Sequence, residues 1–434
     1  MRARRPLLRT ALVCVLLALS AFSAAGCGAE EDRTLVVLGP WTAGEEKPFV
    51  AALAKIGERT GHRYVYEGTR SLRETLVAQL RTDSPPDVAI LSGQGELAEY
   101  ARDGDAKPLP EELAGAAISP WAPRVSLPDE HGEQRQHAYW VPVRVDLKSL
   151  VWSRAHAPGG SGGDRWCLGM ESGGMSGWPG TDWIEDLLLQ LHGSAVYERW
   201  ATGDLSWTGP EVRSAWRAWR TLLTADGARA GEEAISTSFE SLGDGRYGLL
   251  NRGDCAREHQ GSFIRRHYGD DVTPRPTAEF LAGPRGLPGF TGPAASGERV
   301  FEVSGDMAAV FTPSDAAWEL MSRLVRRETR DDWAAAAEPA ERPFFPDATT
   351  GPGRLTAGTS AALKLFREAE RVCFDASDAM PPTLRGAFHR AVLEFLHRPR
   401  DARLLDGLLK QLESERLLQE KADAFALDHL CVRR

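Results

Sequence analysis

Beyond its first 27 residues, this 434-residue sequence has no apolar run long enough to cross a bilayer as a helix. It also lacks a dense basic patch, and its formal net charge of −9 argues against a nucleic-acid partner. Neither a CxxC pair nor a clustered Cys/His pattern is present, so a zinc site is not expected. A P-loop, an HExxH motif and an EF-hand pattern are absent too, and we expect no metal or cofactor.

The first 27 residues have the pattern of a bacterial export signal. Four arginines precede a short apolar run, and small residues then lead to Cys27. Small residues before Gly-Cys resemble a lipobox, whose cysteine carries lipid, although Ala24 stands where leucine is usual. We therefore expect a signal peptide at 1–26, a tether at 27–33 and a lipid anchor on Cys27. Ordinary secretion with cleavage elsewhere is the alternative.

Cysteine usage points to disulfides rather than metal binding. An even number of cysteines in an exported protein favours disulfide pairing, and four remain after Cys27. Four cysteines allow three pairings, of which we prefer Cys167–Cys255 and Cys373–Cys431.

The pattern of apolar residues indicates an α/β protein. Strand-like runs at 34–38, 64–66 and 87–91 alternate with helical spacing. Thr42 with Glu45, and Ser71 with Glu74, have the spacing of capping boxes at the starts of the first two helices. This alternation predicts a parallel sheet covered by helices. Further helices are expected near 182–192, 195–202, 211–225, 314–327, 358–371, 382–397 and 401–425.

The remaining length suits two domains rather than one core. Residues 139–152 are strand-like and lead out of the first unit, and the glycine-rich stretch 157–165 is expected to be a loop. Residues 281–297 are rich in proline and glycine and are expected to be extended.

Eight passages together resemble the extracellular solute-binding proteins of carbohydrate ABC importers, and most of all their α-glucoside-type receptors. The resemblance covers nearly the whole chain after the signal segment. The passages are GPWTAGEE (39–46), YEGTRSLRETL (66–76), PPDVAIL (85–91), VDLKSLVW (145–152), ESGGMSGWPGTDWIEDLLL (171–189), HQGSFI (259–264), VSGDMAAVF (303–311) and FDASDAMPP (374–382).

This resemblance implies a type II periplasmic-binding-protein fold with two α/β lobes that close on a ligand by a hinge motion. The expected lobes are 34–143 plus 281–335, and 144–280 plus 336–434. The expected function is capture of a carbohydrate outside the cell membrane and its delivery to ABC transporter permease subunits. Such a receptor is expected to be a lipid-anchored monomer without enzymatic activity.

A sugar site needs planar hydrogen-bonding groups and aromatic faces. Trp41, Thr42 and Glu45 follow the first strand, at the sheet edge where α/β proteins bind ligands. Trp178 lies on a glycine-rich loop with little local packing. The full set of expected ligand-binding residues is Trp41, Thr42, Glu45, Arg70, Arg144, Asp146, Glu171, Trp178, His259, Gln260, Gly305 and Asp306.

Several of these positions have a simpler structural interpretation. Trp41 fits a packing role at the start of a helix, and Arg70 fits a solvated arginine. Asp146 fits the cap of a helix that begins at Leu147. Asp182 or Thr181 is interpreted as a helix N-cap.

Residue Trp183 starts an amphipathic pattern and is expected in the core. A disulfide between Cys167 and Cys255 would bring the segments 167–183 and 255–263 together, close to the expected site.

Two segments depart from the family pattern. The stretch from Ser153 to Asp164 is shorter than usual, and 336–346 reads AAEPAERPFFP where a glycine-rich turn is usual. Because of these two departures, the sequence does not determine the identity of the ligand. A degenerate receptor that acts as a sensor or surface protein is an alternative. A glycoside hydrolase is a further alternative, but Glu185 and Asp186 point about 100° apart on a helix and cannot flank one bond.

Overall fold

The computed structural model describes residues 34–128, 133–154, 165–224, 230–240, 247–291 and 298–434. The predicted signal segment, tether and Cys27, and most of the shortened stretch 153–164, lie outside these ranges. Within them, no helix combines the length and apolarity that crossing a bilayer requires.

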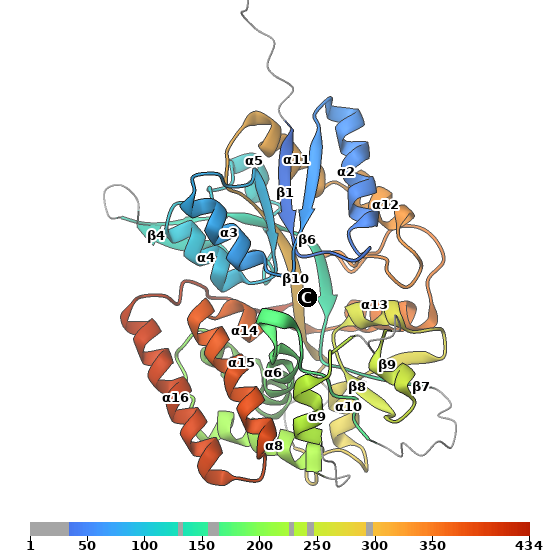
Figure 1. Ribbon diagram of the computed structural model, residues 1–434, viewed down its shortest axis with the longest axis vertical. Helices are drawn as coiled ribbons and strands as arrows, with labels where there is room; N and C mark the ends of the chain where they lie inside the picture. The colour runs from blue at the N-terminus through green and yellow to red at the C-terminus, as the bar shows by residue number, and fades with distance from the viewer. Residues whose placement is uncertain (1–33, 129–132, 155–164, 225–229, 241–246, 292–297) are drawn as a thin grey trace, which may run out of the picture.

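Three parallel strands form the upper end of the main sheet in Figure 1. Strand β1 (Leu35–Gly39) pairs with β2 (Tyr64–Gly68) and with β3 (Val88–Leu91), as the alternating pattern predicted. Helix α2 (Lys47–Thr60) buries its apolar side and ends at Gly61, whose φ of 76° suits glycine.

The long strand β10 (Val300–Val310) connects the two ends of the sheet. Its last residues pair antiparallel with β3, and its first residues pair parallel with β11 (Arg371–Phe374). Strand β6 (Trp140–Leu147) runs antiparallel along β10 through most of its length. Strand β12 (Cys431–Arg433) completes the order β12-β11-β10-β3-β1-β2, with β6 pairing beside β10.

Two lobes lie above and below this crossing in Figure 1. The upper lobe carries helices on the β1–β3 end of the sheet: α2, α3 (Leu72–Arg81), α4 (Gln94–Arg102), α5 (Glu111–Ala114), α11 (Asp315–Leu324) and α12 (Arg327–Ala336). A hairpin of β4 (Val125–Pro128) and β5 (Gln134–His137) projects from its side.

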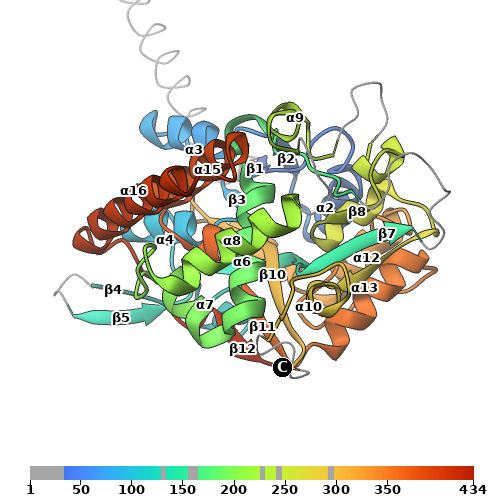
Figure 2. The same ribbon diagram turned by 90° about the horizontal axis from the view of Figure 1, so that it is seen from below.

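The lower lobe is mainly helical. It contains α6 (Trp178–His192), α7 (Ser194–Ala201), α8 (Pro210–Thr224), α9 (Ala230–Ser236), α10 (Thr277–Ala282), α13 (Ala357–Glu368), α14 (Ala376–Ala379), α15 (Pro382–His397) and α16 (Ala402–Lys421). A small sheet of β7 (Leu150–Arg154), β8 (Arg257–His259) and β9 (Val272–Pro276) lies beside them, and Figure 2 shows it from below. Short 3₁₀ segments η1 (Gly173–Met175), η2 (Leu249–Arg252) and η3 (Ser262–His267) complete the lobe.

Aromatic packing stabilises the lower lobe. The rings of Trp200, Trp207 and Trp216 surround Phe388 at centroid distances of 4.8–6.0 Å, and all are fully buried. Each such side chain contributes roughly 1.5–3 kcal/mol through burial. Trp183 is also buried, which confirms its expected core position.

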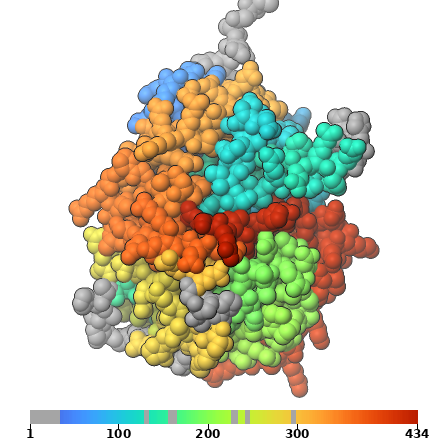
Figure 3. All heavy atoms as spheres, turned by 180° about the vertical axis from the view of Figure 1, so that it is seen from behind, coloured from blue at the N-terminus to red at the C-terminus, as the bar shows by residue number. Residues whose placement is uncertain are grey.

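Both preferred disulfides are present. Cys167 is bonded to Cys255, and Cys373 is bonded to Cys431. The second bond joins the adjacent strands β11 and β12. Seen from behind, the C-terminal residues run as a band across the face between the two lobes (Figure 3).

Several local predictions need correction. Helix α2 begins at Lys47, five residues after Thr42, so the capping box at Thr42 and Glu45 is wrong. Ser71 does precede α3, but its side chain makes no capping hydrogen bond. The strand-like stretch 139–152 is divided by Lys148 and Ser149, where φ of Ser149 is 59°.

Helix α6 begins at Trp178, before the expected cap. Asp182 and Thr181 therefore lie inside this helix, and their N-cap interpretation is wrong. Asp146 lies within β6, which continues to Leu147, so it caps no helix.

Candidate functional site

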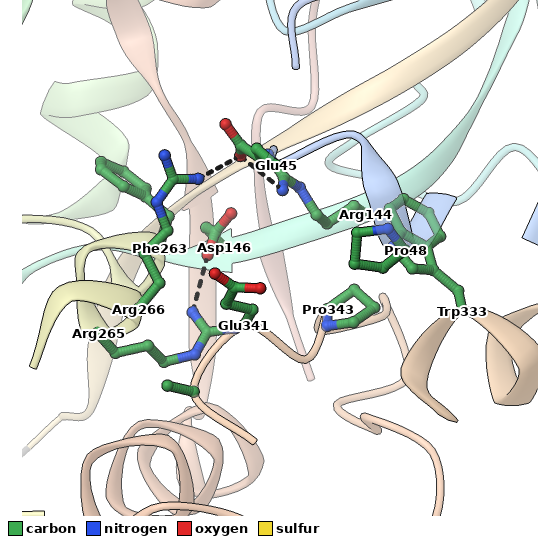
Figure 4. Close-up of a pocket in the computed structure, with 11 residues that line it drawn as sticks. Glu45, Pro48, Arg144, Asp146, Phe263, Arg265, Arg266, Trp333, Glu341 and Pro343 are labelled. Atoms are coloured by element: carbon green, nitrogen blue, oxygen red, sulfur yellow. Dashed lines mark hydrogen bonds and ion pairs between the residues drawn. The ribbon is translucent and has the colours of Figure 1, made fainter. Parts of the chain in front are cut away.

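A pocket opens between the two lobes. It holds about 450 Å³ of free space, counting solvent at its mouth. Six charged residues line it: Glu45, Arg144, Asp146, Arg265, Arg266 and Glu341. The other lining residues are Pro48, Phe263, Trp333, Ala340 and Pro343. Figure 4 shows the carboxylates and guanidinium groups grouped around the hollow, with Pro48 and Trp333 at one side.

Glu45 pairs with two of the arginines that line the pocket. It follows β1 in a turn, where its N–H donates to the carbonyl of Thr42 at 3.1 Å. Its Oε1 is 3.0 Å from Arg144 Nη1 and 2.7 Å from Arg266 Nη1. Burial alone would raise the pKa of Glu45, but the two guanidinium charges lower it to about 2. Glu45 is therefore an ionised bridge between β6 and the lower lobe.

Arg144 and Asp306 are register partners on the neighbouring strands β6 and β10. Arg144 Nε donates to Asp306 Oδ2 at 2.8 Å, and Trp41 Nε1 donates to the same oxygen at 3.3 Å. The Arg144 guanidinium lies 4.8 Å from the centroid of the Trp41 ring. A Cβ on Gly305 would lie 2.9 Å from the carbonyl oxygen of Arg144, so glycine permits this close pairing.

Trp41 itself is 2% exposed and lies beneath the pocket rather than in its wall. Its ring packs against Trp333 at 5.2 Å, and Trp333 lines the hollow. Trp41 is thus a supporting residue, and the aromatic side chains at the surface of the pocket are Trp333 and Phe263.

Asp146 lies two residues after Arg144, on the same face of β6. Ser262 Oγ donates to its Oδ1 at 2.6 Å, and Arg265 Nη1 lies 3.4 Å from the same oxygen. Burial lowers the pKa of Arg265 to about 10, although Asp146 acts against this. The Arg265 guanidinium lies 4.1 Å above the ring of Phe344, which fixes its orientation.

The predicted residues Arg70 and Thr42 lie outside the lining, near Glu45. Arg70 Nε donates to Thr42 Oγ1 at 3.0 Å, and Arg70 Nη2 is 3.3 Å from Glu240 Oε1. The side chain of Arg70 is 52% exposed, so Arg70 is a largely solvated arginine with two polar partners.

Four other predicted residues are not brought to the pocket. His259 points inward, where its Nε2 is 2.7 Å from Asp186 Oδ2 and its ring stacks on Trp183. Gln260 is buried, and its side-chain oxygen accepts from the N–H of Gly261 at 3.2 Å. Glu171 is exposed and accepts from the N–H of Gly173.

Trp178, the fourth, packs against two phenylalanine rings. Its centroid lies 4.8 Å from that of Phe239 and 5.8 Å from that of Phe263. Because Phe263 lines the pocket, Trp178 lies one ring behind the lining.

Sequence reasoning missed Phe263, Arg265 and Arg266, although Phe263 lies within the passage 259–264 and the two arginines follow it directly. It also missed Trp333 and Glu341. The segment 336–346 departs from the family pattern, and its residues Ala340, Glu341 and Pro343 contribute to one wall of the pocket. That departure was the available signal.

A second cluster of charges is buried where the crossing strands meet α6. The ammonium of Lys148 lies 2.9 Å from Asp182 Oδ2 and 3.4 Å from Glu302 Oε1, and it also contacts Asp375. The Oε2 atom of Glu185, close by, accepts from the N–H of Ala376 at 2.8 Å.

The carboxylates of Asp182, Glu302 and Asp375 lie within 4.8 Å of one another and have the ligand types of a cation site. The Lys148 ammonium already occupies the space among them, so these residues fit an internal ion-pair cluster better than a metal centre.

This cluster makes stability depend on pH. Burial raises the pKa of Asp182 to about 7 against the effect of Lys148, and burial also raises the pKa of Glu185 and of Glu302. The folded state keeps these protons at pH values where the unfolded chain has lost them, so this contribution to stability is full below about pH 4 and is lost progressively as the pH rises to about 7. We expect the free energy of unfolding to fall by about 1 kcal/mol per pH unit between pH 5 and 7.

Urea unfolding at pH 5, 6 and 7 measures this slope. Asp182→Asn removes one of the titrating groups and should make the slope shallower. Asp332→Asn is the control, because Asp332 is a carboxyl whose pKa is lowered and which stays ionised throughout this range. Equal slopes in the wild type and in Asp182→Asn would contradict the assignment.

No family model matches the chain. The sequence is 28% identical over 424 residues to the osmoprotective compounds-binding protein GgtB of Synechocystis sp., covering 89% of this chain and 94% of that protein. It is 26% identical over 417 residues to the alpha-glucosides-binding periplasmic protein AglE of Rhizobium meliloti, covering 88% of each.

Among solved structures, a chitin oligosaccharide binding protein superposes with a TM-score of 0.65 at 15% identity, covering 91% of this chain and 99% of that one. This similarity gives the chain the type II periplasmic solute-binding fold that the sequence predicted. The relatives are named as binding proteins, in agreement with the expected lack of enzymatic activity.

Proposed function

We propose that this chain is an extracytoplasmic receptor that captures a sugar, of the α-glucoside class, between its two lobes and delivers it to an ABC transporter permease. The observation that carries the proposal is the pocket itself, which takes residues from the upper lobe, from β6 and from the lower lobe. A ligand touching all three favours the closed arrangement over an open one, as a transport receptor requires.

The chemistry of the lining supports a sugar. Guanidinium and carboxylate groups are planar and form several hydrogen bonds at once, so they replace the water around sugar hydroxyls. Phe263 and Trp333 line the pocket, and their aromatic rings can pack against the apolar C–H face of a sugar ring. The names of the two relatives, one for alpha-glucosides and one for osmoprotective compounds, agree with a small polar solute.

Membrane attachment is part of the same proposal. Lipid on Cys27 would anchor the protein to the outer face of the cell membrane through the tether 27–33. The receptor would then act as a monomer beside its permease, with the two lobes moving about the crossing strands β6 and β10.

A thermal-shift screen against sugars tests the proposal. A bound ligand stabilises the folded protein by about 2.7 kcal/mol at a hundredfold excess over its dissociation constant. A clear shift with maltose, trehalose, sucrose or a longer glucan, without turnover of the sugar, is the expected result. Absence of a shift with every sugar, from folded protein, would contradict the importer function and favour the sensor alternative.

Phe263→Ala should weaken binding of the sugar found in this screen by about tenfold. The reason is the loss of one stacking face, worth roughly 1.4 kcal/mol. Isothermal titration calorimetry measures the change. Leu418→Ala is a suitable control, since Leu418 is 61% exposed on α16, outside the pocket lining. An unchanged affinity in Phe263→Ala would remove this ring from the binding surface.

A further inference from the structure

A chain of ion pairs crosses from one lobe to the other beside the pocket. Glu45 of the upper lobe binds Arg266 at 2.7 Å, and Arg266 Nη2 is 3.3 Å from Glu240 Oε2. Glu240 Oε1 in turn lies 3.3 Å from Arg70, which returns the chain to the upper lobe. His267 also contacts Glu240, at 3.4 Å. Two links of this chain therefore join the lobes directly.

Three aromatic rings form a row that extends from the pocket past this chain of ion pairs. Phe263 lines the pocket, Trp178 packs on Phe263 at 5.8 Å, and Phe239 packs on Trp178 at 4.8 Å. Trp178 is partly exposed, whereas neither it nor Phe239 belongs to the pocket lining. We call the rings of Phe263, Trp178 and Phe239 the aromatic row. Glu240 follows Phe239 directly in sequence, so the ion-pair chain lies beside the part of this row that is outside the pocket.

The three arginines of the lining are already paired with carboxylates of the protein. Arg144 is paired with Glu45 and Asp306, and Arg265 is paired with Asp146. Arg266 is paired with Glu45 and Glu240. An anionic ligand would have to displace one of these carboxylates, so the pocket suits an uncharged ligand.

The size of the pocket limits the ligand as well. The 450 Å³ of free space includes open solvent at the mouth of the pocket, so it is an upper bound on the volume that a ligand can fill. Within that bound the pocket takes no more than a short glycoside. A longer chain has to extend beyond it.

We propose that the ion-pair chain Glu45–Arg266–Glu240–Arg70 sets the ligand length, by closing the pocket around a short uncharged glycoside and separating it from Trp178 and Phe239. This inference rests on the proposed sugar-binding function. Breaking the chain at Glu240 joins the pocket to the aromatic row, so that further sugar units stack on Trp178.

The test is calorimetric titration of the purified protein with methyl α-glucoside, sucrose, trehalose, maltose, maltotriose and maltohexaose. We expect the wild type to bind its best one- or two-ring sugar at least 50-fold more tightly than maltohexaose. Glu240→Gln keeps the shape of the side chain but removes its charge, and should reduce this ratio below tenfold. Arg70→Gln breaks the same link from the other side and should act in the same direction.

Asp406→Asn is the matched control, because it removes an ion pair with Arg213 between α8 and α16 and should keep the wild-type ratio. Wild-type binding of maltohexaose within threefold of the best disaccharide would overturn the inference. So would an unchanged ratio in folded Glu240→Gln and Arg70→Gln, and in both cases the proposed function would stand. Failure of every sugar to bind the wild type would overturn the proposed function and this inference with it.

Discussion

Replacing Lys148 with methionine should lower the free energy of unfolding by about 3–5 kcal/mol at pH 8. Lys148 supplies the ammonium that contacts Asp182, Glu302 and Asp375 in the interior. Methionine has a similar volume but no charge, so the buried carboxylates would lose their cation. The loss should be smaller at pH 5, where these carboxylates take up protons instead. Chemical denaturation at the two pH values measures both effects.

Lys55→Met is the control for this experiment. Lys55 pairs with Asp332 at 2.8 Å, but its side chain is 47% exposed, so the change should cost less than about 1 kcal/mol. Equal losses in the two variants would show that the buried cluster is no more important than a surface ion pair. A loss in Lys148→Met that did not depend on pH would contradict the role of the carboxylates.

The second large effect is on ligand binding. Arg144→Lys should weaken sugar binding about 100-fold, or roughly 2.7 kcal/mol. A lysine keeps the charge, but it cannot contact Glu45 and Asp306 through separate nitrogens of one planar group while lying over the Trp41 ring. Calorimetric titration with the sugar identified by thermal shift measures the change.

Arg323→Lys provides the comparison, since Arg323 pairs with Glu319 on α11, and neither residue lines the pocket. Its sugar affinity should match that of the wild type. If folded Arg144→Lys also keeps wild-type affinity, the guanidinium geometry of Arg144 has no role in binding.

Much of the fold followed from local sequence patterns. Strand β1 and the presence of helix α2 depend on neighbours within a few residues, and the sequence predicted both, although it placed the start of α2 too early. The presence of disulfides followed from an even count of cysteines in an exported chain, whereas their pairing was a preference among three possibilities. Trp183 was expected in the core because it begins an amphipathic pattern.

The candidate site was less predictable because its contacts join distant residues. Glu45 has the spacing of a capping box with Thr42, yet its carboxylate binds Arg266, which lies more than 200 residues away in sequence. Aspartate is a residue type that favours helix N-caps, yet Asp182 pairs with Lys148 inside the protein. A local pattern offers each carboxylate a partner nearby, and the tertiary fold supplies a stronger one.

His259 is a predicted site residue whose side chain the tertiary fold turns away from the pocket. It lies in a passage typical of the family, but its ring is held by Asp186 and Trp183 and faces away from the pocket. The residues that do line the pocket, Phe263 and Arg266, follow within a few positions. Sequence placed the right segment near the site without showing which of its side chains face inward.

The register between β6 and β10 shifts between Asp306 and Met307. Both strands are hydrogen-bonded on either side of this bulge, so rotation of one lobe against the other is a torsion of two coupled strands rather than a swing on loose loops. A bulge bends its strand and increases the local twist, so we expect the lobes to rotate about a point beside Asp306. Rotation at this point would change the distance between Asp306 and Arg144 first, so the expected axis of lobe rotation passes through the ion-pair network of the pocket.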